Sequence, residues 1–149
     1  MDSEDREFLL QFLDSMADDL SFIFEAGARD MPPGTVVQSL WPAWNAVQQR
    51  GDIGRLIAAV RSADYDERLD EAGLSGPELA FKREGWRNAR QAGLQAPSLR
   101  PLKRWLKWID VILGSLIAVI GAGEGLKELK EGFEAELEDI EEGAQADGS

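Results

Sequence analysis

Apolar residues recur every three or four positions along most of the chain, and this spacing limits the possible folds more than any other feature. In residues 4–27 they are Leu9, Phe12, Leu13, Met16, Leu20, Ile23 and Phe24. This period places apolar side chains on one side of an α-helix, with Asp14, Asp18 and Asp19 on the opposite, wet side. No alternating run is long enough to predict a strand. The sequence therefore predicts an all-α fold.

Helix-breaking residues divide the chain into six or seven helices. Residues 31–35 contain Pro-Pro-Gly and predict a loop. The next helix starts near residue 36 or 40, and Pro42 should kink it if it starts at Val36. Gly51 ends that helix, and Asp52 is predicted to cap a short one.

A further start signal lies at residues 75–78, where serine, a first-turn proline and a glutamate follow one another. The chain then ends in two amphipathic segments, residues 101–121 and 124–142, separated by a glycine-rich turn. We expect them to form an antiparallel helical hairpin, with Phe133 packed against the first segment. We expect residues 1–142 to form one compact helical bundle and residues 143–149 to be a disordered tail.

The chain has no cysteine and no histidine. This composition excludes disulfides, thiolate nucleophiles, histidine metal ligands and the usual general base at neutral pH. Residues 117–123 resemble the start of a dinucleotide-binding motif, but Leu126 occupies the position that needs a small residue. We therefore expect no catalytic residues, no cofactor and no metal, and we do not expect an enzyme.

Charge is distributed very unevenly along the chain. Residues 1–30 carry a net charge of −7, residues 124–149 carry −8, and residues 31–123 carry +3, for a total of −12. Two acidic ends favour a protein partner with a basic or apolar patch, because complementary charge speeds association and selects partners. Phosphate repulsion makes direct nucleic-acid binding by the whole chain unexpected.

The basic middle is concentrated in residues 82–107, which include Lys103, Arg104 and Lys107. Such a stretch could bind nucleic acid or an anionic head group. The alternative is that the hairpin brings acids of its second helix beside these three bases, and we favour it because it also corrects unfavourable helix dipoles. The acids expected there are Glu134, Glu138 and Glu141.

Two tryptophan pairs have the three-residue spacing that places side chains on one side of a helix: Trp41 with Trp44, and Trp105 with Trp108. Core packing is one interpretation. The other is an interface, where tryptophan is enriched among the residues that contribute most binding energy. The candidate interaction surface comprises these four tryptophans together with the three bases and three acids of the hairpin.

The longest uncharged run, residues 111–123, is shorter than the roughly 20 residues that span a bilayer. We therefore expect no stable membrane insertion. The acidic start of the chain is unlike a secretory signal, so we expect a cytoplasmic protein.

Together these features favour a small acidic protein-binding module of the adaptor, immunity-like or regulatory kind. One alternative is a nucleic-acid mimic that inhibits a nucleic-acid-binding protein, in the manner of anti-CRISPR inhibitors. A second alternative is a membrane-perturbing effector that uses residues 101–122. Self-association is compatible with each.

Overall fold

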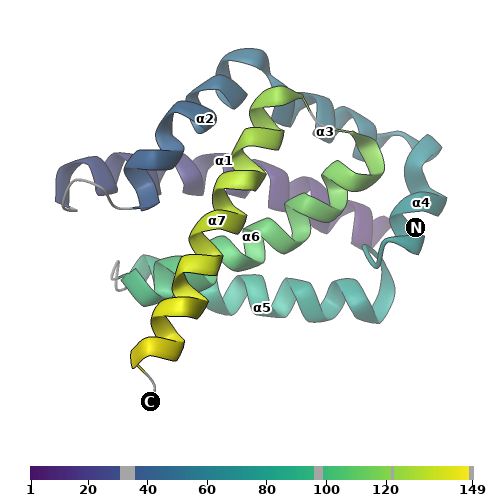
Figure 1. Cartoon of the computed structure of the whole chain (residues 1–149). Helices are drawn as coiled ribbons and strands as arrows, with labels where there is room; N and C mark the ends of the chain where they lie inside the picture. The colour runs from purple at the N-terminus through teal and green to yellow at the C-terminus, as the bar shows by residue number, and fades with distance from the viewer. Residues whose placement is uncertain (31–35, 96–98, 122, 148–149) are drawn as a thin grey trace.

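A computed structural model describes the backbone of residues 1–30, 36–95, 99–121 and 123–147, and it describes side chains within residues 1–22, 40–93, 103–121 and 123–135. The elements in order are α1 (Ser3–Asp30), α2 (Val36–Arg50), α3 (Asp52–Arg61), the 3₁₀ turn η1 (Ala63–Tyr65), α4 (Asp66–Glu71), α5 (Gly76–Gln95), α6 (Leu99–Ile120) and α7 (Glu124–Asp147). No strand occurs within these ranges (Figure 1). The predicted all-α fold is confirmed.

The structure decides two helix boundaries that the sequence left open or placed elsewhere. α2 begins at Val36, the earlier of the two predicted starts, so Pro42 lies inside the helix rather than in its first turn. α7 continues to Asp147, through most of the segment predicted to be a disordered tail. Alanine and glutamine dominate residues 144–146, and both extend a helix at little cost once it has formed. The predicted loop at residues 31–35 lies outside the described residues.

A glycine ends α4 and turns the chain toward α5. Gly73 has a φ of 77°, in the left-handed region that favours glycine. Its amide donates to the carbonyl of Asp70, and the amide of Leu74 donates to the carbonyl of Leu69. This pair of bonds is the Schellman motif, which satisfies carbonyls that the end of a helix leaves unpaired.

The helices pack around α1, whose apolar side becomes the centre of the core. In Figure 1, α1 lies at the back, α5 runs along the bottom, and α7 crosses obliquely in front of α6. α5 packs on α6, α1 packs on α2 and α3, and α7 packs on both α2 and α6.

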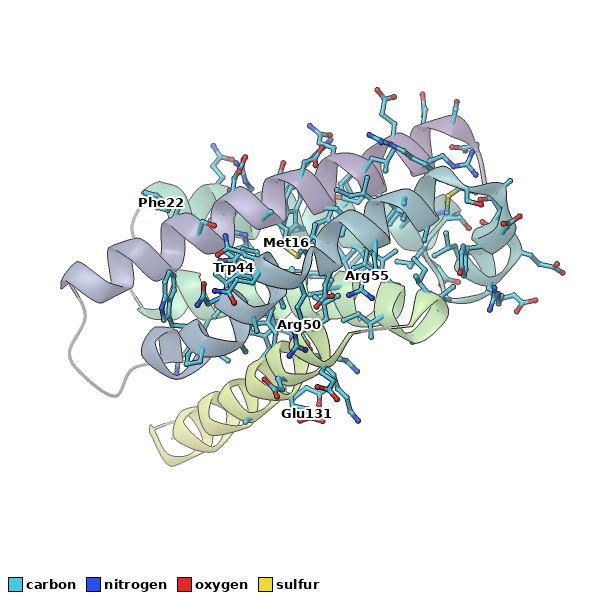
Figure 2. All side chains as sticks on the ribbon, turned by 90° about the horizontal axis from the view of Figure 1, so that it is seen from above. Met16, Phe22, Trp44, Arg50, Arg55 and Glu131 are labelled. Atoms are coloured by element: carbon cyan, nitrogen blue, oxygen red, sulfur yellow. The ribbon has the colours of Figure 1, made fainter. Side chains whose placement is uncertain are left out.

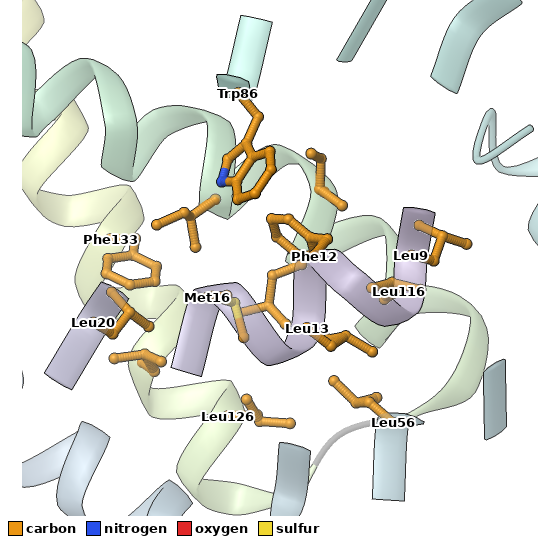
Figure 3. Close-up of a cluster of buried hydrophobic side chains, with 14 of the residues drawn as sticks. Leu9, Phe12, Leu13, Met16, Leu20, Leu56, Trp86, Leu116, Leu126 and Phe133 are labelled. Atoms are coloured by element: carbon orange, nitrogen blue, oxygen red, sulfur yellow. The ribbon is translucent and has the colours of Figure 1, made fainter. Parts of the chain in front are cut away.

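The core is one continuous cluster of buried apolar side chains. Figure 3 shows Phe12, Leu13 and Met16 of α1 in its middle, with Trp86 on one side and Leu56 on the other. Phe12 and Trp86 meet edge to face, with ring centroids 5.4 Å apart. Aromatic pairs in this geometry stabilise a core beyond the area that they bury.

α6 and α7 run in opposite directions, as predicted for the terminal hairpin (Figure 1). A side chain on Gly114 would meet Lys130, and the charge of Glu134 acts on Asp110. Residues later in α7 thus face residues earlier in α6, which is the antiparallel register. Phe133 is fully buried in the shared core.

The hairpin is not a separate unit, because α7 also lies directly on α2. A Cβ atom on Gly132 would come within 2.2 Å of the Leu40 side chain, and one on Gly125 within 3.2 Å of Val47. The seven-residue spacing of these glycines puts both on the same side of α7. Their lack of side chains lets the two helices approach closely.

The prediction that Asp19 lies on the solvent-exposed side of the first helix is wrong. This carboxylate is only 5% exposed and accepts two hydrogen bonds from Arg90 of α5, at 2.7 and 3.2 Å. Asp19 follows Phe12 by seven residues and Met16 by three, so it lies at the edge of the core-facing side. The ion pair links α1 to α5 and compensates the negative charge of the buried Asp19 carboxylate.

Candidate protein-binding surface

The structure separates the members of the two tryptophan pairs. Trp44 and Trp105 are fully buried in the core and are not part of any exposed surface. Trp41 is 44% exposed and Trp108 is half-buried. The three-residue spacing therefore places one tryptophan of each pair in the core and leaves the other at the edge.

Trp105 and Trp108 pack against glycines of α5. A Cβ atom on Gly85 would lie 2.3 Å from the Trp108 ring, and one on Gly93 would lie 2.6 Å from the Trp105 ring. Real Cβ contacts are longer than this, so α5 provides glycine where α6 presents an indole. This packing fixes the position of Trp108 at the junction of the two helices.

Phe81 of α5 rests on Trp108 from the outside. The two rings are 5.8 Å apart at an angle of 67°, which is an edge-to-face contact. Phe81 nevertheless remains 69% exposed, more than either of the other large exposed side chains in the described residues, Phe22 and Trp41. Trp108 therefore supports an aromatic ring that projects into solvent.

Two exposed bases of α6 lie close to Trp108 along the helix. Arg104 lies one helical turn before Trp108 on the same side of α6, and Lys107 precedes Trp108 in the sequence and projects about 100° around the helix from it. We name Phe81, Arg104, Lys107 and Trp108 the aromatic–basic surface. Lys103 lies nearby and is half-buried.

The expected screening of these bases by α7 is not seen among the described side chains. Glu134 pairs with Lys130 on its own helix at 3.3 Å, and none of Lys103, Arg104 and Lys107 has an ion pair within the described part of the chain. The side chains of Glu138 and Glu141 lie outside the described residues, so that part of the prediction remains a prediction.

Other bases of the 82–107 stretch have structural partners that sequence reasoning missed. Arg90 pairs with Asp19, Arg83 lies over the ring of Phe8, and Lys82 donates to the carbonyl of Gly73. Their partners come from α1 and from the end of α4. The core-edge position of Asp19 was the available signal for the first of these contacts.

Asp110 is the one described carboxyl group whose pKa departs strongly from its ordinary value. Burial raises the pKa of Asp110 to about 6, the negative charge of Glu134 adds to the increase, and Lys130 opposes it. One of its oxygens has no hydrogen-bond partner within the described residues. Asp110 faces α7 and is not part of the aromatic–basic surface.

Acidic groups form a second distinct surface on α1. Glu4, Glu7, Asp14 and Asp18 are all exposed and lie on one side of the helix. We name these four residues the acidic ridge, which extends about 21 Å at 1.5 Å per residue. None of the four has an ion pair with a described residue. Uncompensated like charges at this spacing repel one another.

The described residues offer little else that suggests chemistry. They contain no group of three or more acidic side chains placed to hold a metal ion. Among them, no helix combines the length and the apolar character needed to cross a bilayer. Comparisons of the chain with protein-family models, with curated proteins and with solved structures give no match.

Proposed function

We propose that this chain is a small helical protein-binding module, of the adaptor, immunity-like or regulatory kind, that recognises its partner through the aromatic–basic surface. The observation that carries the proposal is the position of Phe81, which is exposed but supported from below by Trp108. Burying a phenylalanine fully is worth roughly 1.5–3 kcal/mol. Because Phe81 is 69% exposed, a partner that covers it gains the larger part of this energy.

The neighbouring charges indicate what kind of partner fits. Aromatic and arginine side chains are the types enriched at protein interfaces, and charges at the rim mainly set association rate and specificity. Arg104 and Lys107 are exposed on α6, within one helical turn of Trp108. The surface therefore suits an apolar pocket with acidic groups at its rim.

The test is a comparison of variants against a partner isolated from the native host. The intact chain serves as bait, and the captured protein is then purified and titrated by calorimetry. Phe81→Ala should weaken binding at least tenfold, and Lys107→Glu should mainly slow association. Gln91→Ala changes another exposed residue of α5 and should leave binding unchanged.

A partner that binds all variants equally would contradict the proposal. So would a partner that is lost only when the acidic ridge is neutralised. That second result would instead support nucleic-acid mimicry.

The acidic ridge favours this second candidate function, a mimic that blocks a nucleic-acid-binding protein. Its four carboxylates lie in a row and have no ion pair among the described residues, so they present uncompensated negative charge as a phosphate backbone does. Neutralising them together, as Gln or Asn, should abolish inhibition of such a protein and leave the fold intact. The Phe81→Ala variant should inhibit normally in that case.

A further inference from the structure

A pocket of about 390 Å³ opens between α3, the turn η1 and the junction of α6 with α7. Its apolar lining includes Leu56, Ala59 and Leu126, and its polar lining includes Asp52, Arg55 and Tyr65. Figure 2 shows Arg55 reaching from α3 toward this junction. The volume lies within the range of small-molecule sites, and polar and apolar groups contribute about equally to the lining.

Asp52 is the unusual residue of this pocket. The sequence predicted that it caps α3, but the cap is Gly51, and Asp52 is the first residue of the helix. It is only 2% exposed; Oδ1 accepts a hydrogen bond from Arg55, and Oδ2 has no hydrogen-bond partner within the described residues. A buried carboxylate oxygen without a hydrogen-bond donor is energetically unfavourable. A ligand that donates a hydrogen bond to Oδ2 would therefore be stabilised here.

The glycines of the α6–α7 junction make room for this carboxylate. A Cβ atom on Gly123 would lie 2.7 Å from Oδ1 of Asp52, and one on Gly125 would lie 3.2 Å from Oδ2. Any other residue would force the carboxylate to move. The positive end of α7 lies beside Asp52 and offsets part of its charge.

The present partner of Asp52 can be displaced at little cost. The side chain of Arg55 is 67% exposed, so its guanidinium can return to water when it leaves Asp52. An incoming ammonium replaces the hydrogen bond that Arg55 gives up, so the buried carboxylate is not left without a donor. Ile120, the last residue of α6, also lines this end of the pocket, and the carboxyl end of a helix carries negative partial charge. The net charge of −12 further raises the local concentration of cations.

We propose that this pocket binds a small organic amine. The ammonium group takes the place of the Arg55 guanidinium on Asp52 and supplies the missing donor. A short apolar chain then lies along Leu56, Ala59 and Leu126. The site shares no residue with the aromatic–basic surface, so it does not depend on the proposed protein-binding function.

The test is an NMR titration of the intact chain with 3-methylbutylamine, with 3-methylbutanol and 3-methylbutanoate as controls. The amine should shift backbone signals of α3 and of residues 120–126, with a Kd of about 1 mM, as expected for so small a ligand. The alcohol and the carboxylate should bind at least tenfold more weakly. Equal binding of all three compounds would overturn the proposal, and so would no binding of the amine at about 50 mM.

Two variants make the result specific to the pocket. Asp52→Asn should weaken amine binding at least tenfold while leaving the weak binding of the alcohol unchanged. Ala59→Phe should fill the pocket and abolish binding, whereas Ala58→Phe changes the exposed neighbouring position and should not. If the amine binds Ala59→Phe as it binds the unmodified chain, the site is elsewhere and the proposal is wrong. This comparison decides the matter even if Asp52→Asn does not fold.

Discussion

At the scale of single residues, glycines decide where helices of this chain can meet. Gly85 and Gly93 accept the rings of Trp108 and Trp105, and Gly132 accepts Leu40. Each occupies a position within a helix where alanine would be favoured by roughly 0.5–1 kcal/mol on backbone grounds alone. Close packing outweighs that preference at these positions.

Replacing one of these glycines should therefore destabilise the protein. Gly85→Ala places a Cβ atom 2.3 Å from the Trp108 ring and should lower the free energy of unfolding by about 1–3 kcal/mol. Gly54→Ala is the matched control, since nothing lies within 4 Å of its Cβ position, and it should stabilise the protein by about 0.5–1 kcal/mol. Urea unfolding measures both. Equal effects of the two substitutions would show that Trp108 does not pack on Gly85.

Asp110 gives stability a predictable dependence on pH. Its pKa is about 6 in the folded chain and about 3.9 in an unfolded one, so the folded state binds this proton more tightly. The contribution of Asp110 to stability therefore falls as the pH rises from about 4 to about 6. Asp110→Asn removes this buried charge and should stabilise the protein at pH 7 by about 1–2 kcal/mol. The gain is smaller than the full pKa shift implies, because a partly exposed carboxylate keeps some hydration.

The measurement is urea unfolding at pH 4 and pH 7. The gain from Asp110→Asn should nearly vanish at pH 4, where the carboxyl group is protonated in the folded state. Asp14→Asn removes an exposed acid of α1 and controls for the general loss of negative charge. An equal gain from both variants at pH 7 would mean that burial of Asp110 is not the cause.

At the scale of elements, α7 is a structural helix on one side and an acidic surface on the other. Leu126, Leu129 and Phe133 are buried in the core, whereas Glu128, Glu131 and Glu134 are exposed. The buried residues contact a core to which α1, α2 and α6 also contribute. Deleting residues 124–149 would therefore uncover the core as well as remove charge, so substitutions are the better probe of this helix.

Phe133→Ala should test how strongly α7 is held. Truncating a buried phenylalanine typically costs 3–5 kcal/mol, and we expect a loss of about that size. Lys127→Ala on the exposed side of α7 should change stability by less than about 0.5 kcal/mol. Chemical unfolding followed by circular dichroism measures both. A loss below about 1 kcal/mol for Phe133→Ala would mean that α7 is detached in solution.

At the scale of the whole molecule, acidic and basic groups lie on different surfaces of a strongly acidic protein. The acidic ridge belongs to α1, and the aromatic–basic surface belongs to α5 and α6. Long-range repulsion from a net charge of −12 opposes phosphate backbones, while the local pattern of aromatic rings and bases is one that single-stranded nucleic acids also use. The two effects oppose each other, and we expect the repulsion from the net charge to dominate.

We therefore expect the intact chain to show no binding to DNA or RNA at about 150 mM salt. Fluorescence anisotropy with labelled single and double strands provides the measurement. Binding that weakens steeply with added salt and is lost in Arg104→Glu would contradict this expectation. It would also mean that the aromatic–basic surface serves nucleic acid rather than a protein.

The sequence by itself determined the helices, since hydrophobic period, glycine and proline act within a few residues of one another. It also determined the antiparallel direction of the last two helices, because the turn between them is short. Tertiary structure decided which helix faces which. Asp19 is buried and pairs with Arg90, and Asp52 lies against the α6–α7 junction instead of capping α3. Phe81 is exposed, whereas Trp105 is buried. These outcomes depend on contacts between residues far apart in the chain. A local pattern can place a residue at the edge of the core, as it does Asp19, but it does not identify the distant residue that will pair with it.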